Sequence, residues 1–243
     1  SQEKKDMLRL CGAKLVEVPA LPYSDPNNYQ HIARRMAEEL AATEENGVLF
    51  ADQWNNLDNR RAHYHSTGPE IWEQTGGKVD GFICAAGTGG TLAGTAAGLR
   101  AFKSDIAIGV ADPAGASLYS YFTEGELKGE GSSITEGIGV GRITGNLEGL
   151  EVTHAYRIED ADMLPVLFDL VKTEGLSLGG SAGVNIAGAM RLARDLGPGK
   201  TIVTMLCDSG ARYAGKLFNP EFLASRGLPV PPWTDTEAPR ETA

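Results

Sequence analysis

The sequence has few cysteines and no pattern of metal ligands. Its three cysteines, Cys11, Cys84 and Cys207, are scattered over 243 residues, so they are too few and too far apart for a disulfide framework. No CxxC pair and no Cys/His spacing typical of zinc sites occurs. His63 and His65 would point to different faces of a helix, and we predict surface residues there rather than metal ligands. A reducing cytoplasm is the compartment that fits this cysteine usage.

Long apolar runs and clusters of basic residues are also lacking. Every apolar run ends well short of the roughly 20 residues that a membrane helix needs, and no signal peptide is recognisable. The formal net charge is −10, without any run of Lys or Arg. Because phosphate backbones and anionic membranes bind clustered cations, the sequence predicts neither a nucleic-acid nor a membrane partner.

What the sequence does contain is a regular alternation of strand-like apolar runs and helical patterns. This alternation predicts an α/β fold, with a parallel sheet covered by helices on both faces. The chain opens on a charged helical pattern, and residues 227–243, rich in Pro and Glu, are predicted to be a tail. Strands are expected over residues 12–18, 47–51, 79–85, 106–111, 151–156 and 201–206, and helices over 28–42, 59–75, 91–102, 161–174 and 182–196.

A glycine-rich turn lies between a predicted buried strand and the helix after it. It consists of Gly87, Thr88, Gly89, Gly90 and Thr91. At a helix N-terminus, unpaired N–H groups and the positive end of the dipole favour an anion. Glycines also let the backbone approach a phosphate closely. The simpler interpretation is a tight turn that binds nothing.

The same turn is compatible with a dinucleotide site, because Asp112 ends the next strand at nearly the spacing of a ribose-binding acid. Two further glycine-rich segments argue against that interpretation. One covers residues 137–141, and the other covers residues 174–183, with Ser181 at a predicted helix N-cap. A dinucleotide site needs one such turn, whereas three fit a smaller phosphorylated cofactor that is held at both ends.

Several motifs resemble those of cysteine synthase (O-acetylserine sulfhydrylase). The resemblance runs from about residue 1 to residue 225, with the motifs in the same order and at closely similar spacing. The motifs that carry it are Gln53-Trp-Asn-Asn, Thr67-Gly-Pro-Glu-Ile-Trp-Glu, Gly87-Thr-Gly-Gly-Thr-Leu-Ala-Gly94, Gly137-Ile-Gly-Val-Gly141, Glu174-Gly-Leu, Gly180-Ser-Ala-Gly183 and Cys207-Asp-Ser-Gly-Ala-Arg-Tyr213.

The resemblance implies a three-layer parallel-sheet fold, the pyridoxal-phosphate (PLP) fold of type II, similar to the tryptophan synthase β subunit. In that fold a small and a large α/β domain enclose the cofactor. Residues 1–56 would be a remnant of the small domain, 57–225 the large PLP-binding domain, and 226–243 a C-terminal tail. Because the family's small domain begins with further segments, we expect an N-terminally truncated version of this fold.

Carried over by position, the resemblance assigns the whole turn from Gly87 to Thr91 to the PLP phosphate. Ser181 would bond the pyridine nitrogen. Since a hydroxyl leaves that nitrogen neutral, it favours loss of a β-leaving group over a long-lived carbanion. Gln53 would bind the carboxylate of the substrate. The loop that borders the substrate pocket would contain Gly137, Ile138 and Gly139.

The implied reaction is a β-replacement, in which acetate leaves O-acetylserine and sulfide adds to give L-cysteine. The family's lysine forms a Schiff base with PLP and then moves the α-proton, but it belongs to a Lys-Asp-Arg segment that this sequence lacks. No catalytic residue is therefore assigned, and we expect the chain alone to be inactive. None of its nine lysines has the required context: Lys4, Lys5, Lys14, Lys78, Lys103, Lys128, Lys172, Lys200 and Lys216.

Three alternatives remain open. The stretch from Gly179 to Ala182 is also similar to cystathionine β-synthase, another β-replacing enzyme. The chain could instead be a non-catalytic remnant that binds a partner, since relatives of this family accept the C-terminal tail of serine acetyltransferase. A nicotinamide dehydrogenase would leave two of the glycine-rich segments unexplained. The resemblance further implies a homodimer.

Overall fold

The computed structural model describes residues 2–234 and divides into two compact units, Ser1–Asn56 (the N-terminal unit) and Leu57–Ala243 (the C-terminal unit). The N-terminal unit contains α1 (Gln2–Leu10) and α2 (Tyr29–Ala41). Asn28 caps α2, because its side-chain oxygen accepts the N–H of Gln30 at 2.9 Å.

The strands expected over residues 12–18 and 47–51 are wrong, because neither segment forms a strand. A strand is stabilised by the N–H and C=O groups of a neighbouring strand, and residues 2–56 contain none. Apolar burial does not fix these segments either, since Asn28 is the one buried residue among the described side chains of this unit. A strand-like sequence without a partner strand stays irregular.

The C-terminal unit is built on a four-stranded parallel sheet with strand order β3-β2-β1-β4. The central strand β1 is buried along its whole length, as a strand covered on both faces must be. The strands are β1 (Gly81–Cys84), β2 (Ala107–Pro113), β3 (His154–Ile158) and β4 (Ile202–Thr204). The helices are α3 (Asp58–His65), α4 (Thr67–Gln74), α5 (Gly90–Arg100), α6 (Leu118–Glu124), α7 (Asp160–Glu174), α8 (Gly180–Leu196), the 3₁₀ helix η1 (Gly210–Tyr213) and α9 (Pro220–Ala224).

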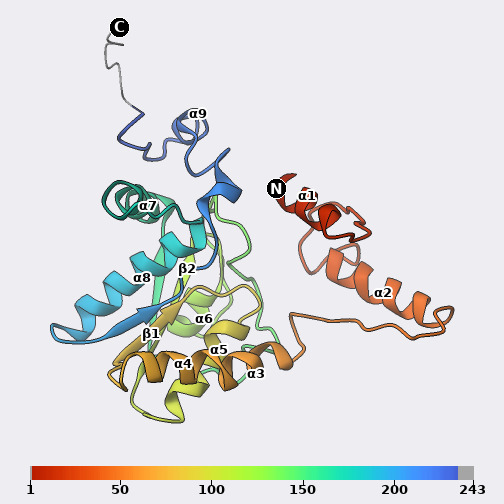
Figure 1. Cartoon of the computed structure of the whole chain (residues 1–243), viewed down its shortest axis with the longest axis horizontal. Coiled ribbons are helices and arrows are strands. Elements are labelled where there is room, and N and C mark those ends of the chain that lie inside the picture. Colours follow the sequence, from red (N-terminus) through yellow and green to blue (C-terminus); the bar gives the residue numbers. More distant parts are fainter. Residues whose placement is uncertain (1, 235–243) are drawn as a thin grey trace, which may run out of the picture. The chain divides into compact units, whose positions relative to one another are not determined.

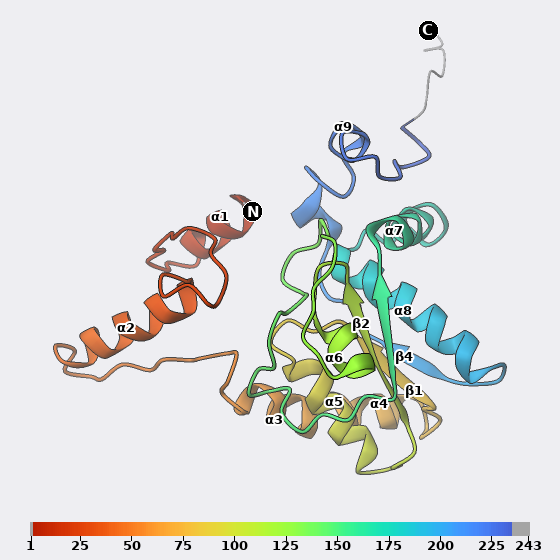
Figure 2. The same cartoon turned by 180° about the vertical axis from the view of Figure 1, so that it is seen from behind.

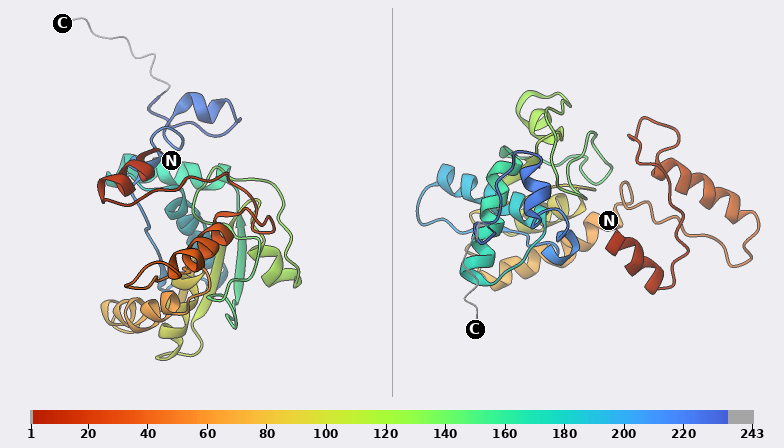
Figure 3. Two further views of the ribbon diagram at one scale, coloured as in Figure 1. Left: turned by 90° about the vertical axis from the view of Figure 1, so that its right-hand side faces the viewer. Right: turned by 90° about the horizontal axis from the view of Figure 1, so that it is seen from above.

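Helices cover both faces of this sheet. α8 lies along one face with α7 beside it, and α3, α4 and α5 lie on the other (Figures 1 and 2). The short α9 lies beyond α7, near the end toward which the strands run (Figures 2 and 3). The predicted three-layer α/β fold with a parallel sheet is confirmed. Its four strands and the helices α5, α7 and α8 begin and end within a few residues of the predicted positions, whereas α6, η1 and α9 were not predicted.

The helix expected over residues 59–75 is two helices, α3 and α4. Ser66 breaks it, with φ −121° and ψ −68°, and its hydroxyl donates to the carbonyl of Ala62 at 2.6 Å. The break lets Gly68 approach α5 closely, since a Cβ on Gly68 would lie 2.9 Å from the Cα of Gly98. Periodicity alone does not reveal this contact, because it joins two helices.

The segment predicted as a tail begins inside the described region. Leu228 and Val230 pack against the apolar core of the C-terminal unit, so this part of the chain lies on the protein. The remainder of that prediction, residues 235–243, lies outside the described residues.

The three cysteines differ in burial. Cys84 is buried, and its burial raises the pKa of the thiol, whereas Cys11 and Cys207 are exposed. Over residues 2–234, no group of His, Cys, Asp and Glu side chains could hold a metal ion. In the same part of the chain, every helix is too short or too polar to span a bilayer.

Thr95 offers a test of polar burial in the core. Its hydroxyl lies in α5, is fully buried and has no hydrogen-bond partner, which is costly in an apolar environment. We expect Thr95→Val to raise the free energy of unfolding by roughly 1 kcal/mol, because valine has the same shape without the hydroxyl. The measurement is denaturant unfolding of the two chains.

Thr204→Val is the matched control. The Thr204 hydroxyl donates to the carbonyl of Ile83 at 2.6 Å, so the same exchange should there lower the free energy of unfolding by roughly 1 kcal/mol. Equal changes at both positions would contradict the assignment of an orphaned hydroxyl at Thr95.

Candidate functional site

The glycine-rich turn joins β1 to α5, and its shape requires glycine. Gly89 has φ +86°, and a Cβ there would lie 2.3 Å from Cγ of Leu147. A Cβ on Gly90 would lie 2.1 Å from Oδ1 of Asn59. A side chain at either position would collide with a neighbour, and at Gly89 it would also strain the backbone. The turn is thus packed tightly against Leu147 and Asn59.

Several hydrogen-bond donors of this turn are free for an anion. Within residues 2–234 the N–H groups of Gly89 and Thr91 have no partner. They stand at the start of α5, where the helix dipole favours negative charge. The Thr88 hydroxyl oxygen accepts the Asn59 side-chain amide at 2.9 Å, so its own proton remains available. These groups suit a phosphate.

His63 was predicted to lie on the surface, and this prediction is wrong. The imidazole is half-buried, with Nε2 3.1 Å from Oγ1 of Thr91 and Nδ1 2.9 Å from Oγ1 of Thr67. A neutral ring that donates from Nε2 and accepts at Nδ1 leaves the Thr91 proton free for a ligand. Burial lowers the pKa of His63, which maintains this neutral form.

We expect the Thr67–His63–Thr91 chain to be sensitive to acid. The folded-state pKa of His63 lies below its unfolded value of about 6.5. The stability that it contributes is therefore complete above that unfolded pKa and is lost as pH falls through the folded pKa. The difference in unfolding free energy between the wild-type chain and His63→Gln should shrink as pH falls from 7 to 5. A difference that stays constant over this range would contradict the neutral imidazole.

The second glycine-rich segment lies beside the first. The N–H of Gly139 donates to the carbonyl of Ala86 at 3.0 Å. The hydroxyl of Thr144 donates to the carbonyl of Thr88 at 2.6 Å. A Cβ on Gly87 would lie 2.5 Å from the carbonyl oxygen of Gly137, so the two backbones approach as closely as glycine allows.

The third segment reaches the same edge of the sheet through α8. One turn after Ser181, the Asn185 side chain accepts the N–H of Ala85 at 2.6 Å and donates to the carbonyl of Met205 at 2.8 Å. The first turn of α8 therefore stands where β1 and β4 end. Ser181 lies inside this first turn, and Gly179 is the N-cap in its place. Ser181 as a residue is 7% exposed, and its hydroxyl has no partner in the described part of the chain.

Two other residues named from the sequence, Gln53 and Asp112, are not part of the glycine-rich segments. Gln53 belongs to the N-terminal unit and follows Asp52, which has φ +38° and pairs with Arg34; its part in a site stays a prediction. Asp112 is fully buried and accepts the N–H of Tyr119 at 2.9 Å, and burial raises its pKa to about 6. A carboxylate enclosed in this way cannot bind a ribose.

The fold and the turn together are typical of one class, α/β proteins that bind a phosphorylated ligand at the carboxyl edge of a parallel sheet. The family described as "Pyridoxal-phosphate dependent enzyme" matches residues 1–208, and the chain belongs to it. Its cofactor is pyridoxal phosphate.

Relatives within this family are named cysteine synthases. The chain is 46% identical over 233 residues to "Cysteine synthase 1" of Neurospora crassa, with 94% of this chain and 61% of the relative covered. It is 40% identical over 243 residues to "Cysteine synthase 2" of Schizosaccharomyces pombe, with 94% and 62% covered. The chain thus spans about six tenths of the length of these curated relatives.

A solved structure has the same fold. It is an "O-acetylserine dependent cystathionine beta-synthase" from Helicobacter pylori, with a TM-score of 0.74 and 29% sequence identity. The match covers 89% of this chain and 66% of that chain.

Proposed function

We propose that the protein makes L-cysteine from O-acetylserine and sulfide, with PLP as cofactor, and that the C-terminal unit carries the cofactor. The observation that supports this most is the meeting of three glycine-rich segments where β1 ends. There the turn of Gly87 to Thr91 offers unpaired N–H groups, and the largely buried Ser181 offers a hydroxyl without a partner in the described part of the chain. Both features fit the two polar ends of PLP.

Each end has a distinct task. The N–H groups of Gly89 and Thr91 and the Thr88 hydroxyl would hold the phosphate, and the Ser181 hydroxyl would hold the pyridine nitrogen. Bound PLP supplies an electron sink for charge that develops on the substrate's α-carbon. A serine at the ring leaves the nitrogen unprotonated, which limits that charge and favours loss of a β-leaving group.

The substrate contacts are part of the same proposal. Gln53 would bind the carboxylate of the amino acid, and the loop from Gly137 through Ile138 to Gly139 would border the substrate. This loop touches the turn through the Gly87 and Gly137 backbones, so a substrate beside it would also lie beside the cofactor's phosphate end.

The test is a steady-state assay of the protein isolated from its natural source. We expect cysteine to form from O-acetylserine and sulfide, with O-acetylserine preferred over serine. Absence of turnover with either donor in the presence of PLP would overturn the proposed reaction.

A second part of the proposal concerns the 243-residue chain by itself, which we expect not to turn over. Lys216 pairs through its ammonium with Glu136, which directly precedes the second glycine-rich segment, so this lysine is not poised as a nucleophile. Borohydride reduction with PLP, followed by mass spectrometry, should find no lysine-linked cofactor. A stoichiometric adduct that disappears in Lys216→Met would contradict this expectation.

Cystathionine synthesis is the second candidate, because the similar Helicobacter pylori protein is named a cystathionine beta-synthase. Comparison of homocysteine with sulfide as the acceptor separates the two reactions. A partner-binding role would appear as binding of a serine acetyltransferase tail peptide without turnover. Homodimer formation and a cytoplasmic location belong to the same proposal, and gel filtration and cell fractionation would test them.

A further inference from the structure

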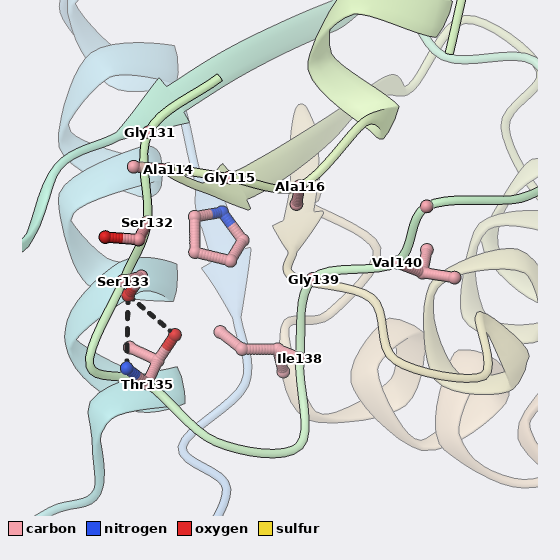
Figure 4. Close-up of a pocket in the computed structure, with 12 residues that line it drawn as sticks. Ala114, Gly115, Ala116, Gly131, Ser132, Ser133, Thr135, Ile138, Gly139 and Val140 are labelled. Carbon is pink, nitrogen blue, oxygen red and sulfur yellow. Dashed lines mark hydrogen bonds between the residues drawn. The ribbon is translucent and has the colours of Figure 1, made fainter. Parts of the chain in front are cut away.

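Figure 4 shows a cavity beside the end of β2, but the proposed function already assigns part of its lining, Ile138 and Gly139, to the substrate loop. A second cavity, of about 340 Å³, lies within the N-terminal unit. Its lining consists of Ser24, Pro26, His31, Arg34 and Arg35. The proposed function uses none of these side chains, so it does not account for this second cavity.

Three basic side chains of α2 form one wall of the second cavity. Arg34 and Arg35 follow His31 by three and four residues, a spacing that brings side chains together on one face of a helix. Nε2 of His31 lies 2.8 Å from the carbonyl oxygen of Tyr23, and Nη1 of Arg35 donates to the carbonyl of Pro26 at 2.9 Å. These two bonds hold the helix against the loop that precedes it.

That loop forms the other wall, and further hydrogen bonds fix it. The buried Asn28 donates its side-chain amide to the carbonyl of Leu21 at 2.7 Å and its main-chain N–H to the carbonyl of Asp25 at 2.9 Å. Ser24 lies between these anchor points, and its hydroxyl has no partner in the described part of the chain. The loop therefore holds a free hydroxyl donor at the cavity without needing it for its own shape.

The cavity has a surplus of positive charge. Arg34 is paired with Asp52 at 2.9 Å, whereas no carboxylate among the described side chains pairs with Arg35. Asp25, the acid of the loop, accepts the N–H of Asn27 at 2.8 Å and does not line the cavity. Over residues 2–234, no acidic side chain lines it. The cavity thus suits an anion and lacks the oxygen ligands that a divalent cation needs.

The donors match a phosphate group. A guanidinium presents its N–H groups as a planar fork, which bonds two phosphate oxygens at once. Arg35 donates to Pro26 through Nη1 alone, so its Nε and Nη2 hydrogens have no partner in residues 2–234. With Arg34 and Ser24, three side chains offer donors, and a phosphate monoester has three terminal oxygens to accept them. Because the whole chain has a net charge of −10, these local donors and not the overall field would attract the anion.

We propose that this cavity binds a phosphate group, either free or at the end of a small molecule. The phosphate would contact Arg35, Ser24 and Arg34. The rest of a phosphorylated molecule would lie against Pro26 and the imidazole of His31, and the volume falls within the range of small-molecule sites. This site shares no residue with the turn of Gly87 to Thr91, and it does not depend on the proposed reaction.

The experiment follows the amide NMR signals of the full chain, without PLP, during separate titrations with inorganic phosphate and glycerol 3-phosphate. We expect saturable shifts at Ser24 and Arg35 with both. Tighter binding of glycerol 3-phosphate would identify a phosphorylated small molecule as the occupant, and tighter binding of inorganic phosphate would identify the free ion. Acetate, with two oxygens and one charge, should bind there about tenfold more weakly. Equal shifts with sodium chloride at the same ionic strength, or shifts confined to Gly89 and Thr91, would overturn the proposal.

Variants of the lining side chains locate the phosphate. Arg35→Gln should weaken binding about tenfold, and Arg35→Lys, which keeps the charge without the fork, should weaken it less. Ser24→Ala removes a hydroxyl that has no partner in the described residues, so it should leave the fold intact and still weaken binding roughly fivefold, even if Arg35→Gln fails to fold.

Arg194→Gln is the matched control, because it removes the same charge from an exposed arginine in the last turn of α8. It should leave the affinity for phosphate at Ser24 and Arg35 within about twofold of the wild-type value. Equal losses in Arg194→Gln and Arg35→Gln would mean that the overall charge attracts the anion, and they would contradict a built site.

Discussion

A chain carrying Gly94→Ala is expected to lose about 3 kcal/mol of its free energy of unfolding or more. A Cβ on Gly94 would lie 2.1 Å from the carbonyl oxygen of Arg60 and 2.7 Å from Cβ of His63. One is a backbone atom of α3 and the other is the Cβ of a residue in α3, so neither atom can move unless that helix shifts. The measurement is denaturant unfolding followed by circular dichroism.

Gly215→Ala provides the matched control for this prediction. No atom lies within 4 Å of the added Cβ there, and the backbone is not in the left-handed region. We expect a change within about 0.5 kcal/mol. Similar losses of unfolding free energy at both positions would contradict the close contact between α3 and α5.

Gly89→Ala is expected to weaken binding of PLP by roughly 100-fold, because about 3 kcal/mol of strain and displacement would act on the turn. An alanine at φ +86° is strained, and its Cβ would meet the Leu147 side chain at 2.3 Å. Relief of this clash requires a shift of the turn, which displaces the N–H groups proposed to hold the phosphate. Fluorescence titration with PLP measures the effect.

Gly125→Ala is the control that separates the effect of backbone strain alone from an effect on the proposed phosphate site. Gly125 also has a left-handed conformation, φ +79°, but no atom lies within 4 Å of its added Cβ. It should lower stability while leaving PLP affinity within about twofold of the wild-type value, since it ends α6 away from the turn. A loss of affinity at Gly125 as large as that at Gly89 would point to global destabilisation.

The sequence predicts a strand correctly where the strands that pair with it are also present in the chain. The apolar run around Phe82 predicts a buried strand, and the strands on both sides of it are present. The runs at 12–18 and 47–51 have the same local character, but residues 2–56 of the N-terminal unit contain no strand that could pair with them. Strand formation depends on a partner that the local pattern cannot supply.

The glycine-rich turns of the candidate site could be predicted from the sequence, but the hydrogen bonds between its side chains could not. Glycine spacing indicates a turn, because few other residues tolerate the conformation of Gly89. The bond between His63 and Thr91 joins residues 28 apart on different helices, and the bond between Ser133 and Asp160 joins residues 27 apart. Such contacts depend on tertiary packing and cannot be predicted from the local sequence pattern.

The most direct test compares the dissociation constants of PLP and pyridoxal for this chain, with inorganic phosphate as competitor. If the turn from Gly87 to Thr91 holds the phosphate, PLP should bind at least tenfold more tightly than pyridoxal, and phosphate should displace it. Equal affinities for the two compounds, with no competition by phosphate, would contradict a phosphate site at the start of α5.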